Sequence, residues 1–325
     1  MMTATLSTSA PKNGPVLAAV DLRESSQLVI EQAHQLAIER DAELVVLHVV
    51  DLPGGLPMHP MEAERYSDDI VSLLGIEHAA AKQLAELVLS YCPRNPEAFH
   101  TMIDAGEPPT CILRHAADIG ASVIVVGDRR RSGFGRLFRG SVGLKVVRRA
   151  HCSVLLARPF TEGMSGVLAA TDLTELSTPV VRAAANLARA RETQLALLHA
   201  LDTRLDPASA LSPLGPIPII ATKEQVDDLK SSANMLLHSL LELSKVQGGT
   251  IVRNGPAADI IIDSAARGSF ALIVLGTHDL KGLTRLAIGS VAEKVARDAD
   301  CSVFVSRAAE PLINEQRPQE YAQMG

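Results

Sequence analysis

The chain contains nearly the same run of residues twice. Residues 123–142 read VIVVGDRRRSGFGRLFRGSV, and residues 272–291 read LIVLGTHDLKGLTRLAIGSV. Each run holds apolar residues, a glycine, a loop of fixed length and then Gly-Ser-Val. Three residues of the first run recur 149 positions later, namely Gly127 as Gly276, Gly140 as Gly289 and Ser141 as Ser290, and Cys152, which follows the run, recurs at the same offset as Cys301. A constant offset of this kind indicates two tandem copies of one domain.

Earlier landmarks are separated by a slightly larger offset. Asp21 and Asp172 are 151 positions apart, as are His48 and His199. The step of two residues places a small length difference between the second and third strands of the two copies. A chain of 325 residues suits two domains of about 150 residues each. We therefore expect flexible tails at 1–14 and 309–325, a first domain at 15–158, a linker at 159–164 and a second domain at 165–308.

The composition favours domains with aliphatic cores. Hydrophobic residues make up 47% of the chain, whereas aromatic residues make up 3% and Trp is absent. Such cores are built from Val, Leu, Ile and Ala, as in sheets that are buried on both faces. Cys152 and Cys301 precede the last strand of each copy and are expected to be packed core thiols. No Cys or His spacing suggests a metal site, so we assign no metal ligand.

The N-terminal residues and the hydropathy pattern favour a cytoplasmic protein. Residues 1–14 lack the basic and apolar regions of a signal peptide. No run of about 18 apolar residues is present, so we expect no membrane segment.

Apolar strands alternate with helical segments in both copies. The expected strands are 16–20, 43–51, 98–104, 122–127 and 153–158, then 166–172, 194–202, 249–254, 271–276 and 302–307. This alternation predicts right-handed βαβ units, and hence an α/β fold with an open five-stranded parallel sheet in each copy and helices on both faces. Ligands of such sheets bind beyond the carboxyl ends of the strands. Asp21, Val49, Gly127 and the loop before Ser141 should therefore converge on one crevice.

This ordered set of features resembles the universal stress protein family in its tandem, two-domain form. The set comprises an Asp that ends the first strand, LHVVD or LHALD in the second strand, and Gly106 or Gly255 shortly before a Pro-bearing helix start. The resemblance spans residues 15–307. It implies an adenine nucleotide alpha hydrolase-like fold with strand order 3-2-1-4-5. It also implies that the two fifth strands pair as an internal pseudo-dimer, and it leaves open whether two chains form a homodimer.

The resemblance extends to a nucleotide motif. ATP-binding members of the family have a Gly, two residues, a Gly, nine residues and then Gly-Ser or Gly-Thr. The spacing is intact in both copies, as Gly127, Gly140 and Ser141 and as Gly276, Gly289 and Ser290. The second glycine is replaced by Arg130 in the first copy and by Asp279 in the second. Arg130 has the charge to hold a phosphate, whereas Asp279 would repel one, so the first copy is favoured for ATP, with Mg²⁺.

The resemblance also implies a role for each candidate residue. Asp21 and Asp172 would bond the adenosine portion, and Val49 and Ala200 would line the adenine slot. The phosphates would lie on main-chain amides at Gly127, Gly140, Ser141 and Val142 in the first copy and at Gly276, Gly289, Ser290 and Val291 in the second, with Arg130 close by.

These residues also have purely structural interpretations. Asp21 and Asp172 could fix the strand end or cap the next helix. Ser290 and Glu293 have the spacing of a capping box. His48 and His199 lie in apolar strands and are expected to be satisfied core residues.

Three functions remain open. The leading hypothesis is a stress-response protein that binds an adenine nucleotide in at least one half. The alternative is a scaffold that binds no nucleotide and acts through protein partners or another small ligand. A third possibility is that the basic residues within 129–149 contact nucleic acid, although the net charge of −6 opposes binding to a polyanion. No nucleophile elbow, HExxH, Walker lysine or redox Cys pair is present, so we assign no catalytic residue and expect at most slow, incidental ATP hydrolysis.

Overall fold

The computed structural model describes residues 13–23, 25–51, 67–91, 99–128, 141–159, 163–174, 177–201, 222–277 and 288–307, with the backbone alone at 67–74, 76 and 141. These residues form one sheet of ten strands in the order β3-β2-β1-β4-β5-β10-β9-β6-β7-β8. Read from each outer edge toward the middle, both halves have the order 3-2-1-4-5 that the sequence led us to expect.

Strands and helices alternate along each half. The first half contains β1 (Val16–Val20), α1 (Ser25–Arg40), β2 (Leu44–Asp51), α2 (Ser67–Tyr91), β3 (Phe99–Gly106), α3 (Pro108–Asp118), β4 (Val123–Gly127), α4 (Ser141–Arg149) and β5 (Ser153–Ala157). The second half contains β6 (Val167–Ala170), α5 (Ser177–Ala190), β7 (Leu195–Leu201), α6 (Lys223–Ser244), β8 (Gly248–Asn254), α7 (Ala257–Arg267), β9 (Leu272–Gly276), α8 (Ser290–Asp298) and β10 (Ser302–Ser306). All ten expected strands are present.

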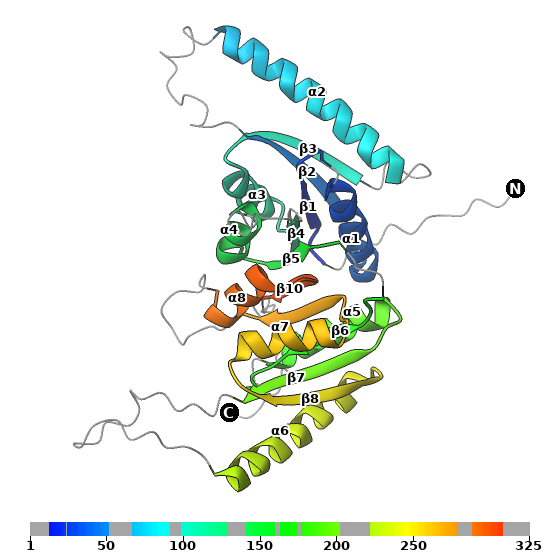
Figure 1. Cartoon of the computed structure of the whole chain (residues 1–325). Helices are drawn as coiled ribbons and strands as arrows, with labels where there is room; N and C mark the ends of the chain where they lie inside the picture. The colour runs from blue at the N-terminus through cyan, green and yellow to red at the C-terminus, as the bar shows by residue number, and fades with distance from the viewer. Residues whose placement is uncertain are drawn as a thin grey trace, which may run out of the picture.

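The sheet is parallel within each half and antiparallel where the halves meet. In the first half, β1 pairs with β2 on one side and with β4 on the other. At the junction, β5 and β10 pair with Leu155 opposite Phe304. Figure 1 shows these two strands side by side in the middle of the molecule. The pairing covers the apolar edge that each fifth strand would otherwise expose, and it forms the expected internal pseudo-dimer.

Helices cover both faces of the sheet, and each face has its own core. Alternate residues of one strand face opposite cores, so Val16 and Ala18 pack in one core and Leu17 in the other. The first core lies under α1, α2, α5 and α6, and the second under α3, α4, α7 and α8. Both cores continue across the two halves, so the tandem copies pack as one body (Figure 1).

A buried arginine joins the two halves. Arg158 is 0% exposed, and its guanidinium donates to the Asp128 carboxylate through Nε (2.8 Å) and to the carbonyls of Cys301 (2.9 Å) and Ala296. Asp128 follows β4 of the first half, whereas Ala296 lies in the last turns of α8 of the second half. Arg158 therefore links the end of one domain's strand to the end of the other domain's helix.

The equivalent arginine of the second half makes the reciprocal contacts. Arg307 donates through its backbone N–H to Ser153 Oγ (3.1 Å) and through Nη2 to the carbonyl of Val147 (3.0 Å). The backbone N–H of Arg158 donates in the same way to Ser302 Oγ (3.1 Å). These contacts give the junction an approximate two-fold symmetry.

Two residues that we assigned to the N-terminal tail are hydrogen-bonded to the first half. Asn13 Nδ2 donates to the carbonyl of Arg40 (2.6 Å), and Ser122 Oγ donates to the carbonyl of Gly14 (2.6 Å). Residues 1–12 and 308–325 lie outside the described residues. Of the helices described, none combines the length and the apolar character needed to cross a bilayer.

Candidate functional site

Each half has a cavity at the carboxyl ends of its parallel strands. The first, of about 450 Å³, lies between the ends of β1, β2 and β4 and the starts of α1, α3 and α4. The second, of about 350 Å³, lies between the corresponding elements of the second half. Both cavities lie where strand order reverses on either side of β1 or β6, the position at which open α/β sheets bind ligands.

The candidate residues within the described ranges converge on these cavities. Asp21, Val49, Gly127 and Val142 line the first cavity. The second is lined by Asp172, Ala200, Gly276, Gly289, Ser290 and Val291. Ser141 begins α4, but its side chain is not described. Arg130, Gly140 and Asp279 lie outside the described residues, so their predicted roles remain predictions.

The Asp21 carboxylate organises the loop that enters α1. Its Oδ1 accepts hydrogen bonds from the backbone N–H of Arg23 (3.1 Å) and from Ser26 Oγ (3.1 Å). Leu22 between them has a φ of +58°, in the left-handed region that non-glycine residues seldom occupy. The carboxylate therefore both fixes the strand end and lines the cavity.

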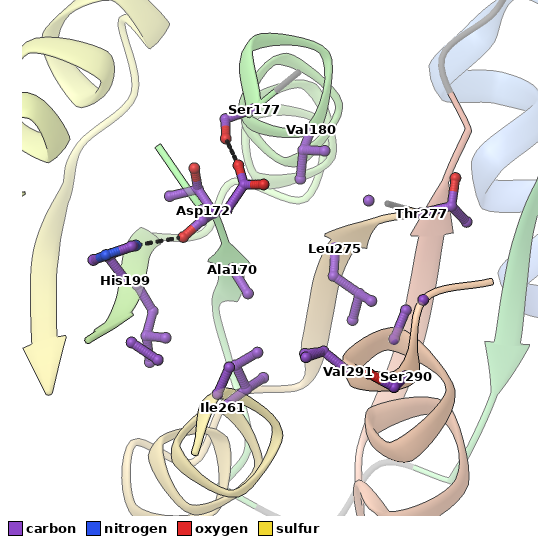
Figure 2. A pocket seen from close by; sticks show the side chains of 17 residues that line it. Ala170, Asp172, Ser177, Val180, His199, Ile261, Leu275, Thr277, Ser290 and Val291 are labelled. Carbon is purple, nitrogen blue, oxygen red and sulfur yellow. Dashed lines mark hydrogen bonds between the residues drawn. The ribbon is translucent and has the colours of Figure 1, made fainter. Parts of the chain in front are cut away.

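The second copy builds the same loop from different residues. Asp172 Oδ1 accepts from Ser177 Oγ (2.7 Å) and from both the backbone N–H (3.0 Å) and the hydroxyl (2.8 Å) of Thr174. Leu173 has a φ of +61°. Figure 2 shows Asp172 and Ser177 meeting at the rim of the second cavity. Because the equivalent leucine of both copies has a left-handed φ, we infer that this backbone conformation is required by the structure of the site.

Two histidines support the first strand of each copy. His48 Nδ1 lies 2.9 Å from the carbonyl of Val20, and His199 Nδ1 lies 2.9 Å from the carbonyl of Thr171 (Figure 2). Because a carbonyl only accepts, Nδ1 carries the proton in both rings. The expectation of satisfied histidines is confirmed, although both rings also line the cavities.

The start of α8 faces the second cavity without a side-chain cap. Gly289 is the N-cap residue and has no side chain to offer, and Ser290 is the first helical residue. The predicted capping box of Ser290 and Glu293 is wrong, because the Glu293 carboxylate instead accepts from Arg148 Nη2 (2.6 Å). The first N–H groups of this helix are thus available to an anion in the cavity.

The glycines that end β4 and β9 have a packing role that the sequence did not reveal. A Cβ at Gly127 would lie 3.1 Å from Val29 Cγ2, and one at Gly276 would lie 2.9 Å from Val180 Cγ2. These glycines allow α1 and α5 to approach the strand ends closely, which narrows the floor of each cavity.

The wall of each cavity that faces α3 or α7 is apolar. Val49, Ile112 and Val126 form it in the first copy. Ala200 and Leu275 replace Val49 and Val126 in the second. Figure 2 shows Ile261 and Leu275 on this wall, with Ser290 and Val291 at the helix start near them. Each cavity thus combines an apolar slot, a carboxylate and a helix N-terminus.

The basic run near α4 is partly neutralised. Lys145 Nζ lies 3.0 Å from Glu107 Oε1, and Arg148 Nη2 lies 2.6 Å from Glu293 Oε1. The basic residues at 129–139 lie outside the described ranges. Two of the exposed basic side chains of α4 are therefore paired, and Arg149 is exposed beside them.

Comparison with known proteins identifies relatives of both halves. The sequence model of the universal stress protein family matches residues 12–158 and again residues 164–307. Universal stress protein YxiE of Bacillus subtilis is 28% identical over 144 residues, which cover 43% of this chain and 97% of that protein. A universal stress protein of Mycobacterium tuberculosis is 30% identical over 154 residues, which cover 46% of each chain. The crystal structure of a universal stress protein from Archaeoglobus fulgidus matches with a TM-score of 0.60 at 18% identity, over 91% of this chain and 99% of that one, and so shares its fold.

Proposed function

The chain belongs to the universal stress protein family in tandem form, and on that premise we propose that it is a cytoplasmic stress-response protein that binds an adenine nucleotide in at least one half. The first half is favoured. Binding, rather than turnover, is the proposed activity, since the sequence contains no nucleophile elbow, Walker lysine or redox Cys pair. Among the described residues, no cluster of three metal-binding side chains occurs. Any Mg²⁺ would therefore arrive on the nucleotide's phosphates.

The observation that carries the proposal is the order of chemical groups along each cavity. An apolar slot suits a purine ring, a carboxylate suits a ribose hydroxyl, and a helix N-terminus suits a phosphate. In the second half these groups are Ala200, Asp172 and the start of α8 at Gly289. These chemical groups occur in the same order at equivalent positions of both halves. This favours the same class of ligand in both cavities over a different ligand in each.

The charges near the cavities favour the first half. Arg130 is expected in the loop that follows β4, whereas the second half has Asp279 at the equivalent position. A phosphate gains from a nearby guanidinium and loses from a nearby carboxylate. The first half should therefore bind nucleotide more tightly.

Isothermal titration of the purified chain with ATP and Mg²⁺ tests the proposal. Asp21→Asn keeps the size of the side chain but removes its charge, so binding in the first half should weaken about tenfold or more. The matched control is Asp118→Asn, which removes an exposed carboxylate that lines neither cavity. Absence of heat and of thermal stabilisation at millimolar ATP would leave the scaffold alternative instead.

A further inference from the structure

Among the described residues, an arginine lines the first cavity, and no arginine or lysine lines the second. Arg23 lines the first cavity, and Thr174 occupies the equivalent position of the second half. Thr174 does not line its cavity, because its hydroxyl turns back to Asp172 Oδ1 at 2.8 Å. The duplication thus supplies an internal comparison. Both loops have a leucine in the left-handed region, and of their described residues only Arg23 presents a cation to a cavity.

The loop holds the backbone of Arg23 in place while leaving its guanidinium available. The backbone N–H of Arg23 donates to Asp21 Oδ1 (3.1 Å) and to Ser26 Oγ (3.2 Å). The residue is exposed, and within the described parts of the chain its side chain makes no ion pair or hydrogen bond. The backbone of this arginine is held in place, and its guanidinium is available at the edge of the cavity. Such a side chain is suited to a bidentate contact with an anion.

The position of Arg23 along the cavity indicates which part of a nucleotide it would meet. The base slot lies at Val49 and Ile112, and the phosphate end lies at Val142, in the first turn of α4. Asp21 directly follows β1 between these two regions, where the ribose of a bound nucleotide would lie. Because the backbone N–H of Arg23 donates to Asp21 Oδ1, the Arg23 side chain starts beside this ribose region.

We propose that Arg23 makes the first cavity selective for adenine nucleotides that carry an additional phosphate on a ribose hydroxyl. The guanidinium contacts that phosphate, and the Asp21 carboxylate accepts from the remaining hydroxyl. This division of labour matches the chemistry by which an acidic residue recognises a free ribose hydroxyl and an arginine accommodates a phosphorylated one. Asp51 also lines this cavity, and its carboxylate repels a phosphate. The attraction that gives the selectivity must therefore come from Arg23. The inference rests on the proposed nucleotide function and refines it.

The test is a titration of the full chain with AMP, adenosine 2′,5′-bisphosphate and adenosine 3′,5′-bisphosphate. At least one bisphosphate should bind about tenfold or more tightly than AMP, because charge-assisted hydrogen bonds are worth this much. Arg23→Thr, which gives the first loop the residue of the second, should abolish the preference. Arg23→Lys should retain part of it. Thr174→Arg should create the preference for a bisphosphate in the second half. The bisphosphate isomer that binds more tightly identifies the ribose hydroxyl whose phosphate Arg23 contacts.

Three results would overturn the inference. Equal binding of AMP and both bisphosphates to the wild-type chain would overturn the role of Arg23 while leaving the proposed nucleotide function intact. Persistence of a preference in Arg23→Thr, with an unchanged melting temperature, would do the same. Failure of all three nucleotides and of ATP to bind would overturn both proposals together.

Discussion

Arg158 places a positive charge where solvent does not reach, at the junction of the two halves. Its partners are the Asp128 carboxylate and the carbonyls of Ala296 and Cys301. Removing one member of a buried network leaves the others desolvated and unpaired. We therefore expect Arg158→Ala to lower the free energy of unfolding by about 3–5 kcal/mol, measured by urea unfolding followed by circular dichroism.

The control for this variant is an arginine at the same junction that remains in water. Arg148 pairs with Glu293 across the two halves, but its side chain is 48% exposed. Arg148→Ala should cost only about 0–1 kcal/mol, because solvent screens the pair. Similar losses in the two variants would contradict the importance we assign to the buried site.

Burial also determines the reactivity of the cysteines. It raises the pKa of the Cys111 and Cys152 thiols to about 11, against an ordinary value of 9.0. The protonated form is thus favoured in the folded chain. The resulting stabilisation is complete below pH 9 and is lost as the pH rises toward 11.

The thiolate is the reacting species, so both thiols should resist iodoacetamide in the native protein at pH 7.5. Mass spectrometry of the native and urea-unfolded chains measures the difference. Rapid native labelling of Cys152 would show that the core thiol expected from the sequence is accessible.

At the scale of elements, the two copies form equivalent strand–helix contacts with opposite charges. In the first copy, Asp104 of β3 pairs with Arg114 and His115 of α3. In the second copy, Arg253 of β8 pairs with Asp263 of α7 (2.6 Å). Burial alone would raise the pKa of Asp104, but its hydrogen bonds, including those from the α3 side chains, hold that pKa below its ordinary value. The contact has therefore been kept while the sign of each partner changed.

This reversal predicts that the charges can be exchanged as a set. Asp104→Arg alone sets like charges together and should cost about 1–3 kcal/mol. Adding Arg114→Asp and His115→Ser reproduces the second copy, where Arg253 also donates to Ser264 Oγ (2.9 Å), and should recover most of the loss. Urea midpoints of the wild-type, single and triple variants measure the recovery. A triple variant no more stable than the single one would show that the two contacts are not equivalent.

The elements could be predicted from the sequence because their signal is local. Apolar runs such as VLAAV and SVLLAR, bounded by polar residues, located all ten strands. The constant repeat offset separated the two copies, and its two-residue step located their length difference. Asp21 and Asp172 could be placed at cavities because the carboxyl ends of parallel strands meet at one edge.

Residues whose role depends on another half or another helix were missed. Arg158 was counted as the last residue of a strand, since its partners Ala296 and Cys301 lie more than 130 positions away in the sequence. Its repetition as Arg307, with the same offset of 149, was the signal that could have identified it. Arg23 was missed because a turn with a left-handed Leu22 brings it to the cavity, and no apolar pattern reveals such a turn.

At the scale of the molecule, the junction has the symmetry of a dimer within one chain. Arg307 of the second half contacts Ser153 and Val147 of the first. Since Arg158 is the first half's equivalent of Arg307, the first half contains both the donor and the acceptors of this contact. The strand register has the same property, because Leu155 faces its own equivalent, Phe304. A single half is therefore complementary to itself.

Residues 13–159 expressed alone should consequently form a two-fold dimer through β5. Without β10, the edge of β5 would expose the apolar residues that now pack against the second half, and edge strands of this kind pair readily. Light scattering after size-exclusion chromatography measures the mass. Arg158→Ala in the same half should weaken the dimer about tenfold or more, because it removes the reciprocal contact to Val147. The contradicting result is a half that is folded by circular dichroism but monomeric at 100 µM, a concentration on the order of a weak complex's dissociation constant. It would show that the two-fold junction requires residues that differ between the copies. In that case the first substitution to test in the isolated half would be Asp128→Thr, because the second half has Thr277 at this position.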